Sequence, residues 1–313
     1  MDLKRIEHLI QVAEYGSFSK AASVIGIAQP ALGRQVKKLE EECGTPLLYR
    51  HGRGVSLTPD GEKLLTRLRP LLRQMESAVL ELRSDQESPS GTVSLGLTPT
   101  MSGMLGVQLI AAVKERYPQI QLNIVSGYSG YVHEWLINGR VDLAMLHDAR
   151  RSQHIVSLPL AELGLSLISP AGMAPPGDGH NVRVAQLKGI PLVLPTRNHG
   201  LRRTVEYAAS QAGVPLNVVL EIDALELMRE LVMAGMGHTV LAAAAVREQV
   251  AAGTLETRLL GTPALSTRLL LATATNRPVT QAAKAVERIV RTLMEDIEAK
   301  KLYPSLAMLA PGA

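Results

Sequence analysis

The stretch from Gln29 to Glu42, which reads QPALGRQVKKLEEE, decides how the first part of the chain folds. Pro30 stands in the first turn, where the missing N–H of a proline costs a helix nothing. Leu32, Val36 and Leu39 recur at helical spacing, so the sequence predicts a helix with one apolar face. The opposite face carries side chains that can reach phosphate oxygens and the base edges of a major groove, namely Gln29, Arg34, Gln35, Lys37 and Lys38.

The residues before this stretch help to decide between a DNA-reading helix and an ordinary solvated helix. Apolar residues between Leu3 and Ala13 form a first helical stripe, which ends at Gly16. The triplet Ser17-Phe18-Ser19 then supplies a cap for a second short helix over residues 20–24, which stops at 26–28. Two short helices joined by a tight turn have the spacing of a helix-turn-helix motif.

Two short extended runs after the helix, residues 47–50 and 55–57, flank a turn rich in glycine. This pattern predicts a β-wing. Arg50 and Arg53 at its tip suit contact with phosphates or with a minor groove, which we favour over an ordinary exposed hairpin because helix-turn-helix spacing precedes it.

The segments 16–22 (GSFSKAA), 29–32 (QPAL), 44–48 (GTPLL) and 50–61 (RHGRGVSLTPDG) together resemble the N-terminus of a LysR-type transcriptional regulator. The chain departs from the family pattern at Ala28 and Gly33, where the family usually has serine. Gly33 costs about 1 kcal/mol of helix propensity relative to alanine, and a direct DNA contact is lost there. The predicted DNA-binding residues are Ser17, Phe18, Ser19, Gln29, Pro30, Ala31, Leu32, Arg34, Gln35, Lys37, Lys38, Arg50 and Arg53.

Length and composition set the outer bounds. The chain has 313 residues, of which 46% are hydrophobic, so two or more folded domains are expected. The formal net charge of +4 permits nucleic-acid binding without establishing it. The single Cys43 cannot form an internal disulfide, and no N-terminal apolar run resembles a signal peptide, so we expect a cytoplasmic protein. We interpret Cys43 as a packing residue rather than a redox switch, because no second cysteine is present to resolve an oxidised form.

A long helix is predicted over residues 60–84. Its apolar positions are spaced alternately by three and four residues, as in a coiled-coil seam, so the helix should pair with its copy in a second subunit. Pro70 should kink or widen it. The predicted dimerisation residues are Leu65, Leu68, Leu72, Met75, Val79 and Leu82.

Beyond a polar hinge near residues 84–91, strands alternate with helices, which predicts parallel βαβ units. The expected strands are 92–97, 121–125, 141–146, 165–168, 191–194, 218–222, 239–242 and 268–274, and the expected helices are 105–116, 132–138, 201–212, 224–234, 244–251 and 280–297. The tail 300–313 gives no signal beyond disorder or packing on a neighbour.

This second part is similar to the effector-binding domain of LysR-type regulators, whose two α/β subdomains are built like a periplasmic solute-binding protein with the ligand between them. The expected division is a winged helix-turn-helix domain at 1–59, a linker helix and hinge at 60–90, and an effector-binding domain at 91–313. Within the last, subdomain I should comprise 91–161 and 268–300, and subdomain II should comprise 162–267.

In open α/β sheets, ligands bind beyond the carboxyl ends of the strands, near helix N-termini. This rule selects Thr98, Thr100, Met101, Ser102, Ser126, Gly127, Tyr128, His147, Thr196, Arg197, Asn198, His238 and Thr239 as effector-binding residues. The set suits a small anion, with Thr100 and Ser102 donating hydrogen bonds and Arg197 supplying charge-assisted ones. Each hydroxyl taken alone fits a helix cap equally, and Arg197 equally fits a surface residue or an oligomer contact.

Enzymatic motifs are missing from the sequence. It contains no Gly-x-Ser-x-Gly elbow, no Gly-x-x-x-x-Gly-Lys loop and no His-Glu-x-x-His pair. A metal site of His147, His199 and His238 has no cysteine or closely spaced histidine to support it, so no metal and no cofactor are expected. A transport-type solute receptor is the rival class, and the winged-helix start argues against it.

The sequence therefore predicts a LysR-type DNA-binding regulator that is not an enzyme and that senses a small, anionic effector. The expected partners are double-stranded promoter DNA, the effector, RNA polymerase and further copies of the chain, as a dimer and, by the family resemblance, a tetramer; no membrane is expected. Closure of the effector cleft would change the placement of the paired DNA-binding heads. The family resemblance implies that activation of transcription is more common than repression.

Overall fold

The computed structural model describes residues 2–52, 54–83, 88–148, 152–175, 181–197, 199–303 and 305–309, without the side chains of 70, 73, 74 and 76–83. The chain divides into two compact units, Met1–Met75 and Glu76–Ala313. Each unit has its own hydrophobic core, so the two are described separately.

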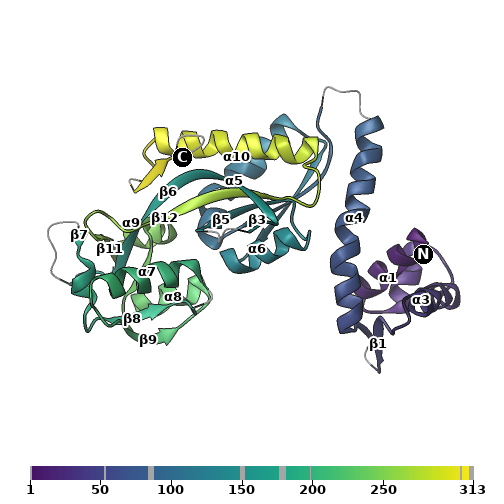
Figure 1. The fold of residues 1–313 in the computed structure, drawn as a ribbon, viewed down its shortest axis with the longest axis horizontal. Coiled ribbons are helices and arrows are strands. Elements are labelled where there is room, and N and C mark those ends of the chain that lie inside the picture. The colour runs from purple at the N-terminus through teal and green to yellow at the C-terminus, as the bar shows by residue number, and fades with distance from the viewer. Residues whose placement is uncertain are drawn as a thin grey trace. The chain divides into compact units, whose positions relative to one another are not determined.

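The first unit is a winged helix-turn-helix, as predicted. It contains α1 (Leu3–Tyr15), α2 (Phe18–Ile25) and α3 (Gln29–Cys43), followed by the antiparallel wing strands β1 (Leu48–His51) and β2 (Gly54–Leu57) and by α4 (Pro59–Arg83) (Figure 1). Ser17 caps α2, because its Oγ accepts the Lys20 N–H at 3.4 Å. Ala28 provides no side-chain cap for α3, as its missing hydroxyl predicts.

The wing is tied to the helices by backbone contacts. The Val55 N–H donates to the Gly16 carbonyl oxygen at 2.9 Å. Gly54 has a φ of +143°, and a Cβ at that position would lie 2.5 Å from the same oxygen, so a larger residue would push the wing away from α1. One oxygen of Glu40 on α3 accepts the N–H groups of Leu47 and Leu48 at 2.8 and 3.2 Å, which fixes the base of the wing.

Helix α4 runs without a break through position 70, and its apolar residues divide between two faces. Leu65 is 2% exposed within the core of the first unit, so the prediction that it lies in a dimer seam is wrong. Leu68 and Leu72 pack partly buried against that core. Among the α4 side chains that the structure describes, the large apolar ones that are exposed are Leu71 (53%) and Met75 (50%). The predicted seam residues Val79 and Leu82 have side chains outside the described ones.

The second unit is built on one mixed sheet. Its strands are ordered β4-β3-β5-β12-β6-β11-β7, with β10 and β13 also paired to β6. Their bounds are β3 (Gly91–Leu97), β4 (Ile120–Ser126), β5 (Leu143–His147), β6 (Ile155–Pro170), β7 (Asn181–Val182), β10 (Thr239–Ala242), β11 (Leu255–Leu260), β12 (Ser266–Ala274) and β13 (Leu306–Met308). A separate parallel pair is formed by β8 (Pro191–Leu194) and β9 (Asn217–Glu221).

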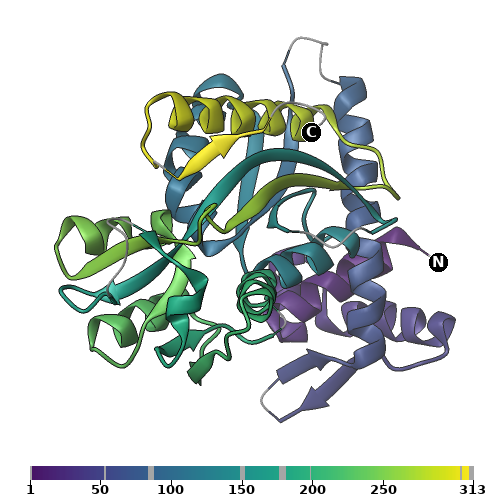
Figure 2. The same ribbon diagram turned by 60° about the vertical axis from the view of Figure 1, so that its left-hand side comes forward.

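Helices cover both faces of this sheet (Figures 1 and 2). Leu143 and Met145 of β5 point into the core shared with α5 and α10, whereas Ala144 and Leu146 point into the core under α6. This alternation follows from the two-residue period of a strand. The helices are α5 (Pro99–Arg116), α6 (Ser129–Ile137), η1 (Val184–Leu187), α7 (Gly200–Gln211), α8 (Leu225–Met233), η2 (Ala243–Val246), α9 (Arg247–Ala251) and α10 (Gln281–Ala299).

Strand β6 is much longer than the predicted 165–168. Its first part pairs with β12 up to Gly164, and from Leu165 it pairs with β10 and β11 instead. The change of partners marks where the chain passes from one subdomain to the other. The first part of β6 was not predicted from the sequence, because Pro159 lies within it and proline argues against a central strand. The structure accommodates it beside a register shift opposite Leu269 and Leu270.

The tail gains a strand that the sequence did not predict. β13 pairs antiparallel with β6 of its own subdomain, with Leu306 opposite Leu163. The Leu306 side chain is buried in the same core as α5 and α10. Residues 306–308 are therefore part of the second unit itself.

Candidate functional site

The outer face of α3 keeps most of its predicted polar side chains exposed. Arg34, Lys37 and Lys38 are exposed, as are Gln29 and Pro30 at the first turn. Leu32, in contrast, is 0% exposed in the core of the first unit, so its prediction as a DNA-binding side chain is wrong. The apolar spacing that identified the helix had already assigned Leu32 to the inner face.

Three other predicted DNA-binding residues, Gln35, Phe18 and Arg50, hold the helices and the wing together. The Arg5 Nε of α1 donates to the Gln35 Oε1 of α3 at 3.2 Å, and Arg5 also pairs with Glu42. Phe18 is buried, and the Arg50 guanidinium lies 4.9 Å from the centre of its ring. These contacts fix α3 and the wing relative to α1 and α2.

Three of the remaining predicted residues lie at the start of α2 or in the first turn of α3. The Ser19 Oγ donates to the Gln29 Oε1 at 3.1 Å, and Ala31 is half-buried. Ser17 has its Oγ occupied as the α2 cap. Arg53 lies outside the described residues.

A cleft opens between the two subdomains of the second unit. It contains an outer chamber of about 430 Å³ and an adjoining inner chamber of about 80 Å³. Both chambers are lined by the same five residues, Tyr128, Ser129, His147, His199 and Gly200. The first three come from subdomain I and the last two from subdomain II, so a ligand here would contact both subdomains.

Four helices begin at the cleft, and none is capped by the side chain of its own N-cap residue. Thr98 precedes α5, Tyr128 precedes α6, His199 precedes α7 and Ala224 precedes α8, each without a capping hydrogen bond from its own side chain. Residues of the first turn of each helix line the chambers. Uncapped helix N-termini present free N–H groups and a partial positive charge, so the site favours an anionic group.

His147 ends β5 at the floor of the cleft. Its Nε2 lies 3.3 Å from the Thr98 Oγ1, and its backbone N–H donates to the Ser129 Oγ at 3.0 Å. Its Nδ1 is buried without a hydrogen-bond partner among the described residues. Burial lowers the pKa of His147 to about 4, although Asp148 opposes this, so the ring is neutral near pH 7.

His199 and Tyr128 meet across the cleft. Their ring centres lie 3.9 Å apart in an edge-to-face arrangement. Burial lowers the pKa of His199, and its Nε2 has no hydrogen-bond partner within the described parts of the chain. Burial, Asp223 and Glu226 raise the pKa of Tyr128 to about 12, while a hydrogen bond that its phenol oxygen accepts from the Leu225 backbone N–H opposes the rise. Tyr128 therefore reaches from the start of α6 to the start of α8.

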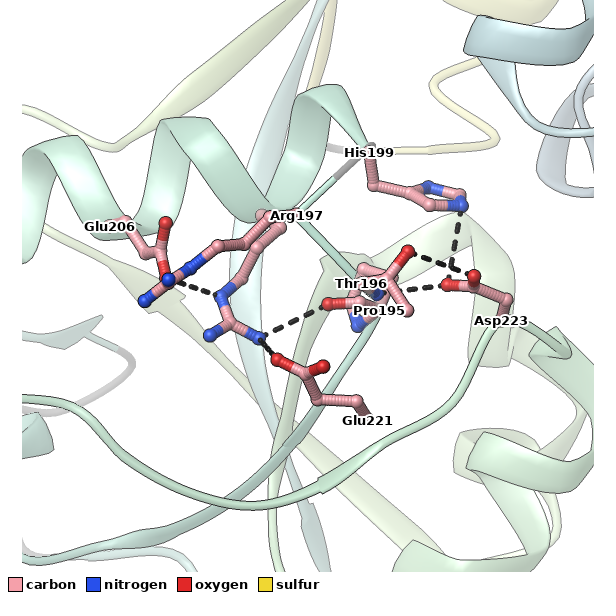
Figure 3. Close-up of polar contacts among 8 residues, drawn as sticks. Pro195, Thr196, Arg197, His199, Glu206, Glu221 and Asp223 are labelled. Atoms are coloured by element: carbon pink, nitrogen blue, oxygen red, sulfur yellow. Dashed lines mark hydrogen bonds and ion pairs between the residues drawn. The ribbon is translucent and has the colours of Figure 1, made fainter.

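The loop after β8 holds a carboxylate at the edge of the cleft (Figure 3). The Thr196 N–H and Oγ1 donate to the two oxygens of Asp223, each at 2.9 Å. The His199 Nε2 lies 3.6 Å from the Asp223 Oδ1. Thr196 therefore positions Asp223, which lines the outer chamber.

A buried arginine fixes the same loop. Arg202 donates to the Pro195 carbonyl oxygen at 3.1 Å, to Glu206 at 2.8 Å and to Glu221 at 3.2 Å. Burial alone would raise the pKa of Glu206, but hydrogen bonds from Arg197 and Arg202 outweigh it and lower the pKa. The network joins α7 to the ends of β8 and β9.

Arg197 is placed differently from the prediction. Its Nε donates to Glu206 at 3.1 Å, and it lines an open depression on α7 with Arg202 rather than either cleft chamber (Figure 3). The guanidinium that lines the outer chamber belongs to Arg203, one turn into the same helix.

The other predicted effector residues divide between the cleft and its surroundings. Thr98, Thr100, Tyr128 and His147 line the chambers. Met101 and Thr239 are fully buried, and the Thr239 Oγ1 donates to the Met228 sulfur at 3.0 Å, so we correct both from ligand contacts to core residues. Asn198 lies outside the described residues.

Four further predicted residues contact other parts of the protein. The Ser102 Oγ donates to the Ser126 Oγ at 3.3 Å on an exposed rim. The His238 Nδ1 lies 2.8 Å from the Ser169 Oγ. A Cβ at Gly127 would lie 2.6 Å from the Trp135 ring, so Gly127 makes room for the indole.

Sequence reasoning missed His199, Arg203 and Asp223 as residues of the cleft, whereas Ser129 ends the stretch 126–129 that the carboxyl-end rule selects. Asp223 follows the end of β9, and the carboxyl-end rule would have selected it had that strand end been used. His199 stands one residue beyond the selected residues 196–198. Nothing in the sequence signals Arg203, because only the direction of α7 turns it toward the cleft. No group of metal-ligating side chains and no helix suited to crossing a membrane occurs within the parts of the chain that the structure describes.

Comparison with known proteins identifies both units. Residues 3–62 match the family "Bacterial regulatory helix-turn-helix protein, lysR family", and residues 86–295 match "LysR substrate binding domain". The nitrogen assimilation regulatory protein nac of Klebsiella aerogenes is 30% identical over 295 residues, which cover 94% of this chain and 95% of the relative. The transcriptional dual regulator OxyR of Escherichia coli is 29% identical over 247 residues, covering 79% and 80%.

Solved structures share the fold over nearly the full length. A full-length OxyR variant from Pseudomonas aeruginosa has a TM-score of 0.72 at 24% identity, covering 99% of each chain. CbnR in complex with its target DNA has a TM-score of 0.69 at 20% identity, covering 94% of this chain and all of that one. The chain belongs to the LysR family of DNA-binding transcriptional regulators, which are not enzymes, and it carries that family's helix-turn-helix and effector-binding domain.

Proposed function

We propose that this regulator binds a small organic molecule with an anionic group in the cleft of its second unit, and that binding changes transcription from the promoters it occupies. The observation that carries the proposal is the convergence of four helix N-termini from both subdomains on one cavity, none of which is capped by the side chain of its own N-cap residue. The Leu225 N–H of α8 donates to Tyr128, so the N-termini of α5, α6 and α7 are the ones that best suit an anion.

The polar groups of the cleft support a ligand rather than a purely structural gap. The His147 Nδ1 and the His199 Nε2 are buried without partners among the described residues, and leaving such an atom unpaired costs about 1–3 kcal/mol. A ligand that satisfied both atoms would recover part of that cost. The hydroxyls of Thr100 and Ser129 add donors at the starts of α5 and α6.

Contacts across the cleft allow a ligand to change how the two subdomains are arranged. Tyr128 of subdomain I touches His199 of subdomain II, and the ligand cavity lies beside this contact. A ligand shifts the balance between two subdomain arrangements only if it binds one of them more tightly. A molecule that contacts both α6 and α7 meets this requirement, because opening the cleft would break one set of contacts.

We further propose that α3 reads double-stranded promoter DNA through Gln29 and Arg34, while Lys37 and Lys38 contact phosphates. Two copies paired through α4 would read two half-sites, a tetramer would form as a dimer of dimers, and RNA polymerase would respond to the resulting DNA geometry.

The names of two relatives point to different signals. The relatives described as hydrogen peroxide-inducible genes activators respond to an oxidant, and nac regulates nitrogen assimilation. The single cysteine of this chain, Cys43, ends α3 in the first unit, and burial followed by Glu42 and Glu40 raises its pKa. A raised pKa disfavours the reactive thiolate, so we favour a metabolite over an oxidant as the signal.

The test uses the full-length protein, a reporter gene under its promoter and a panel of small carboxylates, phosphates and amino acids. Thr100→Ala removes a hydroxyl from the inner chamber and should weaken the response to the active compound roughly tenfold, which is typical for loss of a hydrogen bond to a charged group. Promoter affinity without ligand should stay unchanged. Ser210→Ala, an exposed hydroxyl at the far end of α7, is the control. A full response from Thr100→Ala, or equal losses in both variants, would place the site elsewhere.

A further inference from the structure

Charged side chains are distributed unequally between the two chambers of the cleft. The outer chamber is lined by the carboxylates of Glu134, Asp148 and Asp223 and by one guanidinium, that of Arg203. The described lining of the inner chamber includes no lysine, arginine, aspartate or glutamate. A ligand bearing only negative charge would therefore enter through a chamber with more carboxylates than cations.

Asp148 and Asp223 differ in which groups donate hydrogen bonds to their carboxylate oxygens. Asp148 accepts hydrogen bonds from the Thr267 Oγ1 at 2.5 Å and from the Arg268 N–H at 2.9 Å, which join it to β12. Asp223 receives both of its bonds from Thr196, on one side of the carboxylate. A carboxylate accepts about four hydrogen bonds, so each Asp223 oxygen keeps acceptor capacity.

The His199 ring lies beside this carboxylate. The side chain of His199 is 10% exposed, and its Nε2 stands 3.6 Å from the Asp223 Oδ1, too far for a hydrogen bond between them. Nε2 has no partner among the described residues, and the ring lines both chambers. A neutral histidine with its proton on Nδ1 offers the Nε2 lone pair as an acceptor. Two acceptors 3.6 Å apart suit one donor group placed between them.

The electrostatic surroundings favour a positive charge at that place. Burial comes first in raising the pKa of Tyr128, and the negative charges of Asp223 and Glu226 add to it. Burial lowers the pKa of His199 below its ordinary value, and the negative charge of Asp223 is not enough to reverse this. The charge of Asp223 is thus left without a cationic partner from His199.

The inner chamber fits an apolar group. Its walls include Leu165, Leu201, Leu225, Met228 and Leu241. The starts of α6 and α7 meet where the two chambers join, because Ser129 and Gly200 line both chambers, whereas the start of α5 lines the inner chamber. The cleft therefore offers three kinds of surface in sequence: apolar walls, helix N-termini and a carboxylate paired with a histidine acceptor.

We infer that the effector is a small zwitterion of the aliphatic α-amino acid type. Its ammonium group lies between Asp223 and His199, its anionic group faces the N-termini of α6 and α7, and its aliphatic chain enters the inner chamber. This inference rests on the proposed function and names the chemical class of ligand for that same cleft.

The test measures binding to the full-length protein by calorimetry and by the thermal unfolding midpoint, using the twenty proteinogenic amino acids. Each amino acid that binds is compared with the 2-hydroxy acid that lacks its ammonium and with the amine that lacks its carboxylate. We expect at least one aliphatic amino acid to bind at least tenfold more tightly than both analogues. This comparison uses the unaltered protein, so it does not depend on how a variant folds.

A variant of Asp223 tests whether the ammonium group binds at this carboxylate. Asp223→Asn should weaken amino-acid binding at least tenfold while changing the affinity of the matched hydroxy acid less than about twofold. Glu230→Gln, an exposed carboxylate on α8 outside the cleft lining, is the control and should leave both affinities unchanged.

Two outcomes would overturn the inference: no amino acid binds, or the hydroxy acid binds as tightly as its amino acid. If a carboxylate without an ammonium binds and alters promoter occupancy, the cleft still senses an anion and only the zwitterion is wrong. If no compound of any class alters promoter occupancy, the proposed function itself fails.

Discussion

His147 shows how a single residue links the sheet to the cleft. It ends β5, where the carboxyl-end rule predicts a ligand contact, and the structure places its ring in the lining of both chambers. The ring Nε2 lies 3.3 Å from the Thr98 Oγ1, and the ring is buried. Its pKa of about 4 is the result, since burial disfavours the charged form.

The lowered pKa makes the stability of the second unit depend on pH. The unfolded chain, with an ordinary histidine pKa near 6.5, takes up a proton more readily than the folded one. The contribution of His147 to the free energy of unfolding is therefore fully present above about pH 6.5. It is lost as the pH falls toward 4, by an amount on the order of 3 kcal/mol.

Replacing the ring tests this prediction. His147→Gln should reduce the loss of stability between pH 6.5 and pH 4, measured by urea unfolding with the fluorescence of Trp135, the single tryptophan, which lies in the second unit. Exposed His154→Gln in the same unit is the control. Because His133, His199 and His238 also have lowered pKa values, only the difference between variants counts. Superimposable pH profiles for the original protein and His147→Gln would contradict the assignment.

Some residues of the cleft could be predicted from the sequence, and others could not. His147 and Thr98 were found because each stands next to the end of a strong strand. Asp223 and His199 form their contact from two different loops, and no local pattern reveals such a pair. Arg197 was selected for its charge, but Glu206, nine residues later on the next helix, accepts its hydrogen bond instead.

Among the elements, α4 has apolar side chains on two different faces, one packed in the core of the first unit and one exposed. The seam pattern predicted the helix correctly, but spacing alone could not say which apolar residues face outward. Leu65 serves the core of the first unit, while Leu71 and Met75, one turn apart, remain exposed. The outward pair is the better candidate for contact with a second copy.

Charging that pair should separate the subunits. We expect Leu71→Glu with Met75→Glu to weaken dimerisation roughly 100-fold or more, since two apolar side chains lose about 1.5–3 kcal/mol each when they cannot be buried. The midpoint of unfolding of the first unit should change little, because both side chains are exposed within one chain. Sedimentation velocity measures the oligomer, with Thr66→Glu on another face of α4 as the control. An unchanged oligomer would rule out this face of the helix.

Strands were harder to predict than helices, for identifiable reasons. β8 stands out as a short apolar run, and β4 as a run in which apolar and polar residues alternate. The first part of β6 carries Pro159, which signals the end of a strand, and only its pairing with β12 shows otherwise. β13 is three residues long, too short to carry a pattern, and it exists because β6 offers it an edge.

At the scale of the whole molecule, the two units carry separable tasks. The first unit presents exposed basic and amide side chains on α3, and the second encloses a polar cleft between two subdomains. The architecture could be predicted because the N-terminal motifs are specific and the alternation of strands and helices is regular. The ligand class could not, because it depends on which side chains from distant segments meet in the cleft.

The measurement that tests the central claim most directly is the affinity of the purified full-length protein for DNA. Fragments selected from the genome that encodes it are compared with a shuffled duplex by fluorescence anisotropy over a range of salt concentrations. We predict a preference of at least about 10³-fold for a selected fragment, and a linear fall of log affinity with log salt. Arg34→Ala should reduce the preference by about 1–3 kcal/mol. Equal affinity for both duplexes, or no binding even at low salt, would contradict the account.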